Sequence, residues 1–325
     1  MSSDPTAYAG DMLVRSGAGT SGGDPDTPAG PTAGGGRPRS LWSDAWRDLR
    51  RKPLFWVATV IIAFMILMAV WPTLFTSVNP SEAVLTDSLA TPSGEHIFGR
   101  DVQGYDIYAR AVHGAWVSII VGVMATLGAA LLGGLIGILA GFYGGFLDTV
   151  LSRVADVFLG LPFLLGAIVL LSTFAGPQDD PDKWTIIGLV VFALVLFGWP
   201  LFARMMRASV ISVKNADYVL AARALGASNW RIIWRHLLPN CLAPMLVLAS
   251  VSLGGYIGAE ATLSFLGIGL RYPVISWGVM LNDAGDYVRA FPHTMAAPAL
   301  FLSLTVLSFV LLGDQVREAL DPKLR

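Results

Sequence analysis

Long apolar runs separated by short polar segments dominate the chain from about residue 55 onward. About 20 apolar residues, rising ~1.5 Å per residue as a helix, cross a hydrocarbon core about 30 Å thick. Six runs have about that length, and the third is short and contains Pro162. They are Phe55–Phe75, Val117–Ala140, Phe158–Phe174, Ile186–Met205, Cys241–Leu266 and Met295–Gly313. The pattern predicts an all-α, polytopic membrane protein with six transmembrane helices.

The N-terminal part of the chain differs from these spans. Of the first 40 residues, 27 are Gly, Pro, Ser, Thr or Asp, so the segment buries too little apolar surface to offset its ordering entropy. We interpret residues 1–40 as a disordered cytoplasmic tail, with regulatory docking as the alternative. In residues 41–53, Trp42, Trp46 and Leu49 share an apolar stripe that basic residues follow. This stripe predicts an interfacial amphipathic helix ahead of a membrane domain at 54–325.

Lysine and arginine are distributed unevenly between the two sides of the predicted spans. The segments before the first span and after the sixth, together with 141–157 and 204–240, carry 17 of these residues. The segments 76–116, 176–185 and 267–294 carry five. Basic residues accumulate on the cytoplasmic side of membrane proteins. We therefore expect both termini and the 204–240 segment in the cytoplasm, in a multi-pass protein of a bacterial inner membrane.

The composition offers little chemistry for catalysis. The chain is 54% hydrophobic and 14% charged, whereas soluble domains are about a quarter charged. Its single cysteine, Cys241, excludes an internal disulfide and a thiol metal cluster. Neither a GxxxxGK[ST] phosphate loop nor an HExxH zinc motif occurs, and the four histidines are scattered. We expect a conduit or carrier without catalytic residues, a metal site or a cofactor of its own.

Small residues and one carboxylate stand out within the predicted spans. Gly133, Gly137 and Gly141 follow GxxxG spacing in the second span, which lets helix backbones approach closely in lipid. Glu260, in the outer part of the fifth span, is costly in a membrane and is therefore a functional candidate. The alternative is a structural pairing with a neighbouring helix or an outer-loop backbone, since one carboxylate alone makes a poor proton relay.

The cytoplasmic segment 204–240 predicts two short helices joined at Gly226. Asn215 or Asp217 is expected to cap the first helix, and Ser228 to cap the second. Gly226 is expected to end the first helix in the left-handed conformation.

One face of the first helix carries Tyr218, Ala222 and Leu225. Such a helix pair rests on the leaflet, binds DNA as a helix-turn-helix, or fits a groove in a cytosolic partner. Attachment to spans at both ends disfavours DNA, so no nucleic-acid partner is expected. The pattern alone does not decide between a helix pair that rests on the leaflet and one that docks into a groove of a cytosolic partner.

The stretch AARALGASNWRIIWRHLLPN resembles the EAA loop of bacterial ABC-importer permeases, E-A-A-x-x-x-G followed nine residues later by I-x-L-P. Leu220 stands in place of the glutamate and His236 in place of the isoleucine. The positions that match are Ala221, Ala222, Gly226, Leu238 and Pro239. The resemblance implies an ATPase-coupling site formed by Asp217, Ala221, Ala222, Arg223, Gly226, Ser228 and Pro239. With Leu220 in the acidic position, its contact is expected to be more apolar than the family pattern.

The stretch HIFGRDVQGYDIYARAVHG is similar to H-x-F-G-T-D-x-x-G-R-D-x-x-S-R-x-x-x-G of the dipeptide/oligopeptide/nickel permeases, and Arg100 and Tyr105 depart from it. The matching positions are His96, Phe98, Gly99, Asp101, Gly104, Asp106, Arg110 and Gly114. The stretches GFYGGFLDTVLSRVADVFLGLP, EATLSFLGIG and GDQVREALDPKLR match the same branch. The resemblance covers nearly everything from residue 41 onward. It implies the fold of a type I ABC importer permease and the C-type subunit of the pair.

That resemblance implies a heteromeric importer. A second, B-type permease completes the pathway within the membrane lipid, and two ABC ATPase subunits, or one fused ATPase, supply the ATP and Mg chemistry. An extracytoplasmic substrate-binding protein delivers a di- or oligopeptide; relatives of this type carry nickel chelates, glutathione or haem as alternative cargoes. An ion-coupled secondary transporter predicts paired intramembrane charges and inverted repeats, and neither is evident. A membrane enzyme is disfavoured by the missing nucleophile and metal constellations.

Two further groups of residues are candidates on the outer side. Within the segment RYPVISWGVMLNDAGDYVRAFPH, contact with the binding protein is expected from Trp277, Asn282, Asp283 and Asp286. The alternative is a solvated connection between the fifth and sixth spans. A translocation path near the outer gate is expected to involve Ser252, Glu260 and Ser264.

Overall fold

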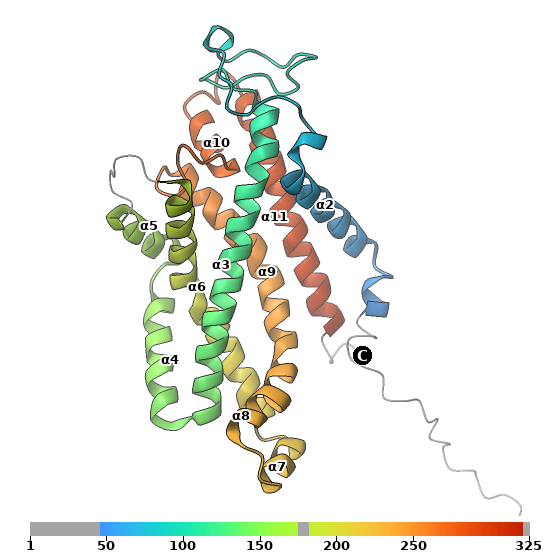
Figure 1. The fold of residues 1–325 in the computed structure, drawn as a ribbon, viewed down its shortest axis with the longest axis vertical. Helices are drawn as coiled ribbons and strands as arrows, with labels where there is room; N and C mark the ends of the chain where they lie inside the picture. The colour runs from blue at the N-terminus through green and yellow to red at the C-terminus, as the bar shows by residue number, and fades with distance from the viewer. Residues whose placement is uncertain (1–45, 175–181, 321–325) are drawn as a thin grey trace, which may run out of the picture. The chain divides into compact units, whose positions relative to one another are not determined.

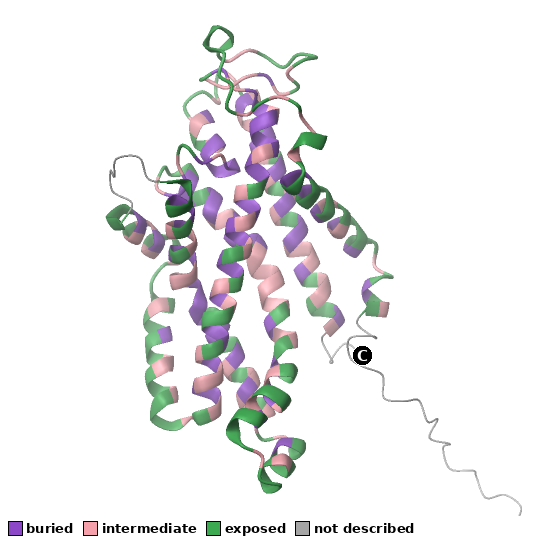
Figure 2. Cartoon of the chain, viewed as in Figure 1, coloured by how far each residue is buried: buried purple, intermediate pink, exposed green. Residues whose placement is uncertain are grey.

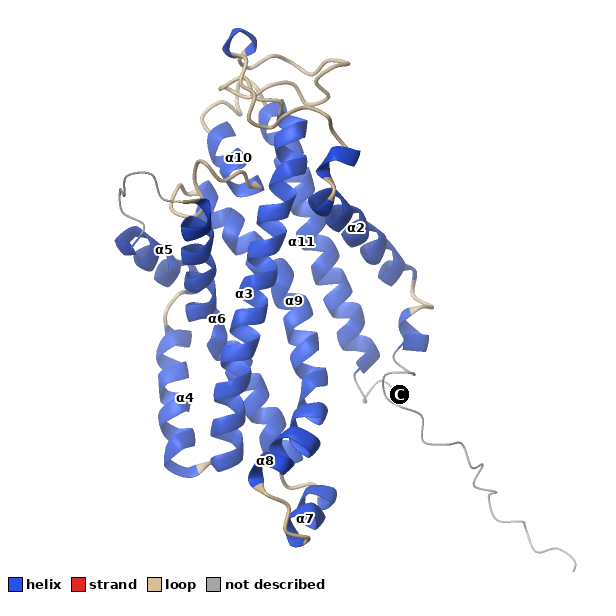
Figure 3. Cartoon of the chain, in the orientation of Figure 1, coloured by secondary structure: helices blue, strands red, loops and turns tan. Residues whose placement is uncertain are grey.

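The computed structural model describes residues 46–174 and 182–320. In these two ranges the chain forms helices and loops, with no strand (Figure 1, Figure 3). The long helices are α2 (Pro53–Val70), α3 (Ile107–Tyr143), α4 (Gly145–Gly160), α5 (Phe163–Phe174), α6 (Lys183–Val213), α9 (Leu238–Phe265) and α11 (His293–Leu320). The short elements are η1 (Pro72–Leu74), η2 (Leu85–Asp87), α7 (Asp217–Ala224), α8 (Asn229–Ile232), a π-helical turn (Ile233–Leu237) and α10 (Trp277–Ala284). The predicted all-α class is confirmed.

The third predicted span differs most from its prediction. Five helical segments are long and apolar enough to cross a membrane, whereas α4 and α5 form a pair bent by 86°. The break falls at Leu161, whose backbone is extended, just before Pro162. Proline lacks an N–H group and disfavours the helical conformation of the preceding residue. The prediction of a continuous span over Phe158–Phe174 was therefore wrong.

The two ends of the described chain show that the broken pair counts as a crossing. Lys52 Nζ, just before α2, lies 2.6 Å from Glu318 Oε2 near the end of α11. Leu49 and Phe55 are buried with Ala319 at the same end. Both ends therefore lie on one side, which requires an even number of crossings. The pair α4–α5 returns the chain from the end of α3 to the start of α6 (Figure 1).

The centre of the bundle is formed by α3 packed along α6 and α9, where buried residues gather (Figure 2). At Gly133 and Gly137 a Cβ atom would meet the backbone carbonyls of Trp199 and Ala203 on α6. Only glycine permits this approach, so the predicted role of the GxxxG spacing in close packing is confirmed. In contrast, α4 buries only Ala155, and most of its surface is exposed (Figure 2).

Two central helices extend beyond their predicted apolar runs. α3 has 37 residues and begins at Ile107, because the Asp106 carboxylate caps it by accepting from the Ala109 N–H. α6 has 31 residues and ends at Val213, so at ~1.5 Å per residue it is longer than a hydrocarbon core of about 30 Å. Hydropathy identifies only the apolar part of each helix and misses polar turns that continue it.

The predicted tail, residues 1–40, lies outside the described residues. Of the predicted interfacial helix at 41–53, residues 46–49 are helical, and a turn leads into α2 at Pro53. Trp46 is exposed, whereas Leu49 is buried.

Candidate functional site

The elbow, which we define as residues 217–232 and expect to face the cytoplasm, lies at the end of the bundle opposite the loops that precede α3 (Figure 1). Gly226 ends α7 with φ +80°, in the left-handed region that favours glycine. Its N–H donates to the Arg223 carbonyl, and the Ala227 N–H donates to the Ala222 carbonyl. This pair of bonds is a Schellman motif, and it confirms the predicted left-handed stop.

The two caps of the elbow differ from one another. The Ser228 hydroxyl accepts from the Arg231 N–H at 3.4 Å and caps α8 as predicted. The N-cap of α7 is Ala216, which provides no side-chain bond. The predicted cap by Asn215 or Asp217 was therefore wrong. Asn215 lies one residue before the N-cap position, and Asp217 is already the first residue of the helix. Asp217 lies in the first turn, where the helix dipole favours a negative charge.

The elbow is anchored by one set of apolar residues and exposes another. Val219 and Ile232 are fully buried against the bundle. Leu220, in the position of the family glutamate, is half-exposed, while Leu225 and Trp230 are 88% and 69% exposed. On the predicted face, Tyr218 and Leu225 are exposed and Ala222 is partly buried, because Val219 is the residue that packs inward. Ala221 and Arg223 are also exposed, so the elbow presents an apolar surface with basic side chains.

A π-helical turn connects this elbow to the membrane. It spans Ile233–Leu237 and leads directly into α9, where Pro239 occupies the first turn. The Asn240 side chain donates to the His236 carbonyl at 2.6 Å. Widened turns of this kind frequently occur at functional positions in helices. The elbow is thus joined to α9 by continuous helix rather than by a flexible linker.

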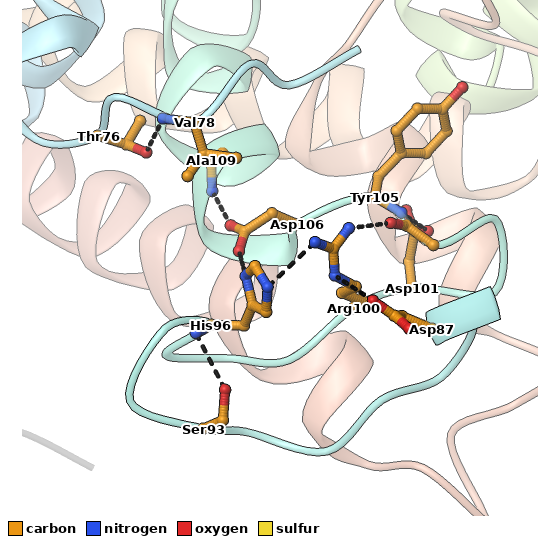
Figure 4. Close-up of polar contacts among 11 residues, drawn as sticks. Thr76, Val78, Asp87, Ser93, His96, Arg100, Asp101, Tyr105, Asp106 and Ala109 are labelled. Carbon is orange, nitrogen blue, oxygen red and sulfur yellow. Dashed lines mark hydrogen bonds and ion pairs between the residues drawn. The ribbon is translucent and has the colours of Figure 1, made fainter. Parts of the chain in front are cut away.

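At the end of the bundle opposite the elbow, the loop before α3 is held together by a polar network (Figure 4). Arg100 donates to His96 Nε2 at 3.0 Å and to the Gly104 carbonyl at 2.7 Å. Because Nε2 accepts, Nδ1 carries the proton and donates to Asp106 Oδ2 at 2.7 Å. Asp106 also caps α3, so the network fixes the loop to the start of the second span.

Arg110 links this loop to α10. Its Nη1 donates to Asp101 Oδ2 at 2.8 Å, and its Nη2 lies 3.8 Å from Asp283 Oδ2. The guanidinium also lies 4.6 Å from the centre of the Tyr105 ring. Burial raises the pKa of the Asp283 carboxyl, an effect that the positive charge of Arg110 opposes. The outer loop, α3 and α10 therefore share one partly buried charge cluster.

The four residues predicted to meet a binding protein divide into two pairs. Trp277 is fully buried, and its indole N–H donates to the Ala111 carbonyl at 2.8 Å. Asp283 turns inward to Arg110. Asn282 and Asp286 are exposed. The structure therefore excludes Trp277 as an outer contact, because α10 folds back against α3 and the predicted solvated connection is largely a packed element.

Glu260 and Ser264 face the interior of the chain. Glu260 Oε1 accepts from the Ser264 hydroxyl at 2.8 Å and from the Ser276 hydroxyl at 3.1 Å. Ser276 caps α10, so this buried carboxyl braces α9 against α10. The arrangement matches the structural alternative for Glu260, and it does not place Glu260 or Ser264 on an open path.

Ser252 has a different position. It lies in a hollow of about 510 Å³ at the bend between α4 and α5, together with Gly255 and Tyr256 of α9. The aromatic residues Phe158, Phe163 and Phe197 also line it. Among the three predicted path residues, Ser252 is therefore the one on an open surface at the level of the spans.

Sequence reasoning missed the link through Arg110 and the bracing by Ser276. The only signal for Arg110 was its match to the family stretch before the second span. Ser276 had no such signal, because its partner Glu260 lies 16 residues away on another helix. Within 46–174 and 182–320, no group of three or more His, Cys, Asp or Glu residues is arranged to hold a metal ion.

Comparisons with known proteins agree with this architecture. The family model described as "Binding-protein-dependent transport system inner membrane component" matches residues 133–325. A second model, "N-terminal TM domain of oligopeptide transport permease C", matches residues 40–92. An inward-facing methionine ABC transporter, MetNI, gives a TM-score of 0.50 at 21% identity, covering 64% of this chain and 95% of that chain. This likeness shows a shared fold.

Relatives with curated names are more similar. The dipeptide transport system permease protein of Bacillus subtilis is 39% identical over 292 residues, covering 88% of this chain and 87% of that protein. The oligopeptide transport system permease protein of the same organism is 35% identical over 286 residues, covering 88% and 91%. The glutathione transport system permease protein of Escherichia coli O157:H7 is 35% identical over 288 residues, covering 88% and 92%. The chain is therefore a multi-pass protein of the bacterial inner membrane and belongs to the family of binding-protein-dependent transport system inner membrane components.

Proposed function

We propose that the chain is the C-type permease subunit of an ATP-driven importer that carries peptides into the cell. The observation that carries this proposal is the cytoplasmic elbow, an exposed apolar surface on a transport subunit that has no phosphate loop of its own. The named functions of relatives at 35–39% identity support a peptide cargo. Glutathione, named for a further relative, is itself a small peptide.

The proposed complex contains one further permease, two ATPase subunits or one fused ATPase, and an extracytoplasmic binding protein. ATP and Mg act in the ATPase subunits. Asp217, Ala221, Ala222, Arg223 and Gly226 form the docking surface, and Ser228 and Pro239 hold the geometry of the following helix. The distribution of basic residues supports a cytoplasmic position for this surface and for both termini. The exposed Leu220 and Leu225 make the contact largely apolar.

The proposed mechanism uses the continuity of helix between the elbow and α9. ATP binding closes the ATPase dimer and displaces the docked elbow, and the π-helical turn transmits this displacement to α9. Moving a two-state equilibrium from 1:99 to 99:1 requires about 5.5 kcal/mol of differential binding. Val219 and Ile232 are buried anchors of the elbow. A buried anchor transmits the displacement of the docked elbow to the bundle better than a mobile loop does. Ser252 and Tyr256 then form part of the surface that lines the substrate path.

Reconstitution tests the proposal. The chain is co-expressed with the permease and ATPase that the neighbouring genes encode, and the complex is purified in detergent. It is then placed in proteoliposomes, with the binding protein either inside or outside the vesicles. We expect co-purification of ATPase and second permease, and ATP-dependent uptake of a labelled di- or oligopeptide. Uptake by the chain purified alone contradicts the importer. Uptake of nickel chelate or haem in place of peptide contradicts the proposed peptide cargo but agrees with the proposed transport mechanism.

A further inference from the structure

A second cavity, of about 270 Å³, lies between α3, α4 and α6. It is separate from the elbow and from the hollow at Ser252. The space exists because small side chains face it from all three helices: Gly137, Ala140, Ala155 and Ala203. Ile136 and Leu151 give it an apolar portion, whereas the guanidinium groups of Arg204 and Arg207 line it together with Ser152 and the carboxylate of Asp156. The cavity is therefore amphipathic, with an apolar wedge and a polar edge at which two guanidinium groups face one carboxylate.

The arginines at this edge are only partly neutralised. Arg204 Nη2 lies 2.8 Å from Asp156 Oδ1, and Arg207 donates from Nε and Nη2 to both oxygens of Asp148. The side chain of Arg204 is 61% exposed and that of Arg207 is 37% exposed. Arg153 on α4 is 81% exposed, and its Nη1 lies 3.8 Å from Asp156 Oδ2, so Arg153 and Arg204 share one carboxylate. The local charges are those of Arg153, Arg204, Arg207 and Lys214 against Asp148 and Asp156, an excess of two positive charges.

The position along α6 places this edge at a membrane surface. α6 begins at Lys183, and about 20 residues of helix cross the hydrocarbon core. The core therefore ends near residue 203, and Arg204 and Arg207 lie among the headgroups on the side to which α6 descends. By the distribution of basic residues, that side is the cytoplasmic leaflet. The apolar wedge at Ile136 lies on the hydrocarbon side of the arginines.

We propose that this cavity binds an anionic phospholipid of the inner leaflet, with the headgroup phosphate at Arg204 and Arg153 and acyl chain in the wedge between α4 and α6. An amphiphile with one negative charge matches both the polarity gradient of the cavity and its excess of positive charge. A protein partner would have to supply an apolar and an anionic group in the same narrow space. The lipid braces α4, which otherwise buries only Ala155 and is held to α6 by two ion pairs.

Lipid titration of the purified complex, followed by native mass spectrometry, tests the site. The probes are palmitoyl-oleoyl phosphatidylglycerol and the phosphatidylcholine with the same chains. We expect preferential retention of phosphatidylglycerol, weakened about fivefold by Arg204→Gln, as is typical for one basic residue at an anionic surface. Arg289→Gln removes an exposed charge from the outer side and is expected to leave retention unchanged.

Two further variants separate lipid binding from a structural role of Arg204. Asp156→Asn removes a competing carboxylate, so phosphatidylglycerol should bind more tightly, whereas a purely structural ion pair predicts no gain. Ala155→Leu fills the wedge without changing charge and should reduce retention. Equal binding of the two lipids, equal effects of Arg204→Gln and Arg289→Gln, or weaker binding to Asp156→Asn would overturn the proposal. Displacement of the lipid by millimolar inorganic phosphate would identify a free-anion site instead and would also overturn it.

Discussion

Gly226→Val isolates the backbone geometry of the elbow from its packing. Gly226 has φ +80°, and no atom lies within 4 Å of the position that a Cβ would occupy. The substitution therefore creates no collision with neighbouring residues. Its cost arises from the left-handed backbone, which a β-branched residue adopts only with strain of about 1–3 kcal/mol. A change of about 2 kcal/mol in the docked conformation weakens ATPase binding about 30-fold.

The assay combines three measurements on the co-expressed complex. ATPase subunits retained in a detergent pull-down report docking, peptide uptake in proteoliposomes reports coupling, and thermal unfolding of the permease reports the bundle. We expect retention and uptake to fall together, while the unfolding temperature of the bundle stays the same, because a side chain at position 226 would meet no atom of the bundle at its Cβ. Gly226→Asn should retain part of the activity, since asparagine tolerates the left-handed region.

Gly94→Val is the matched control. Gly94 also has no atom within 4 Å of its Cβ position, but its φ lies outside the left-handed region, so valine is expected to be tolerated. If Gly226→Val keeps ATPase binding and uptake within about twofold of the unmodified complex, a difference of only about 0.4 kcal/mol, the conformational reasoning is refuted.

Three further predictions concern the bundle and its outer side. Gly137→Leu should lower the free energy of unfolding by about 1–3 kcal/mol through overpacking against α6. Gly188 faces open space, so Gly188→Leu should leave the free energy of unfolding unchanged. Equal thermal stability of the two variants would contradict the overpacking at Gly137. Arg110→Met should lower the free energy of unfolding by about 1–3 kcal/mol, because it removes the cationic partner of two partly buried carboxylates, Asp101 and Asp283. Burial already raises the pKa of Asp283. The penalty for its charged form is therefore full above the folded pKa and disappears as the pH falls from that value to the ordinary pKa of aspartate. A loss of stability that does not change with pH would count against this assignment. Trp277→Ala should cost about 3–5 kcal/mol in unfolding free energy from the lost buried ring, and an effect confined to binding-protein affinity would show that Trp277 is exposed after all.

Much of the membrane architecture follows from local sequence. Five of the six predicted spans correspond to long helices in the structure, because an apolar run must be long enough to replace water with lipid along its whole length. Gly226 and Ser228 also behave as predicted, since a left-handed stop and a helix cap depend on a few neighbouring residues. Close packing at Gly133 and Gly137 followed from their spacing. These features are decided within one turn or one helix.

The features that the tertiary structure decided depend on which elements meet. Trp277 and Asp283 looked like surface residues in a connecting segment, and they are turned inward because α10 folds against α3. Oε1 of Glu260 accepts from Ser276, 16 residues away on another element. The break between α4 and α5 is set by Pro162 together with the return to α6. Hydropathy reports how apolar a segment is. Whether a given side chain faces lipid, a neighbouring helix or an open hollow is determined only by the packing of segments distant in the chain.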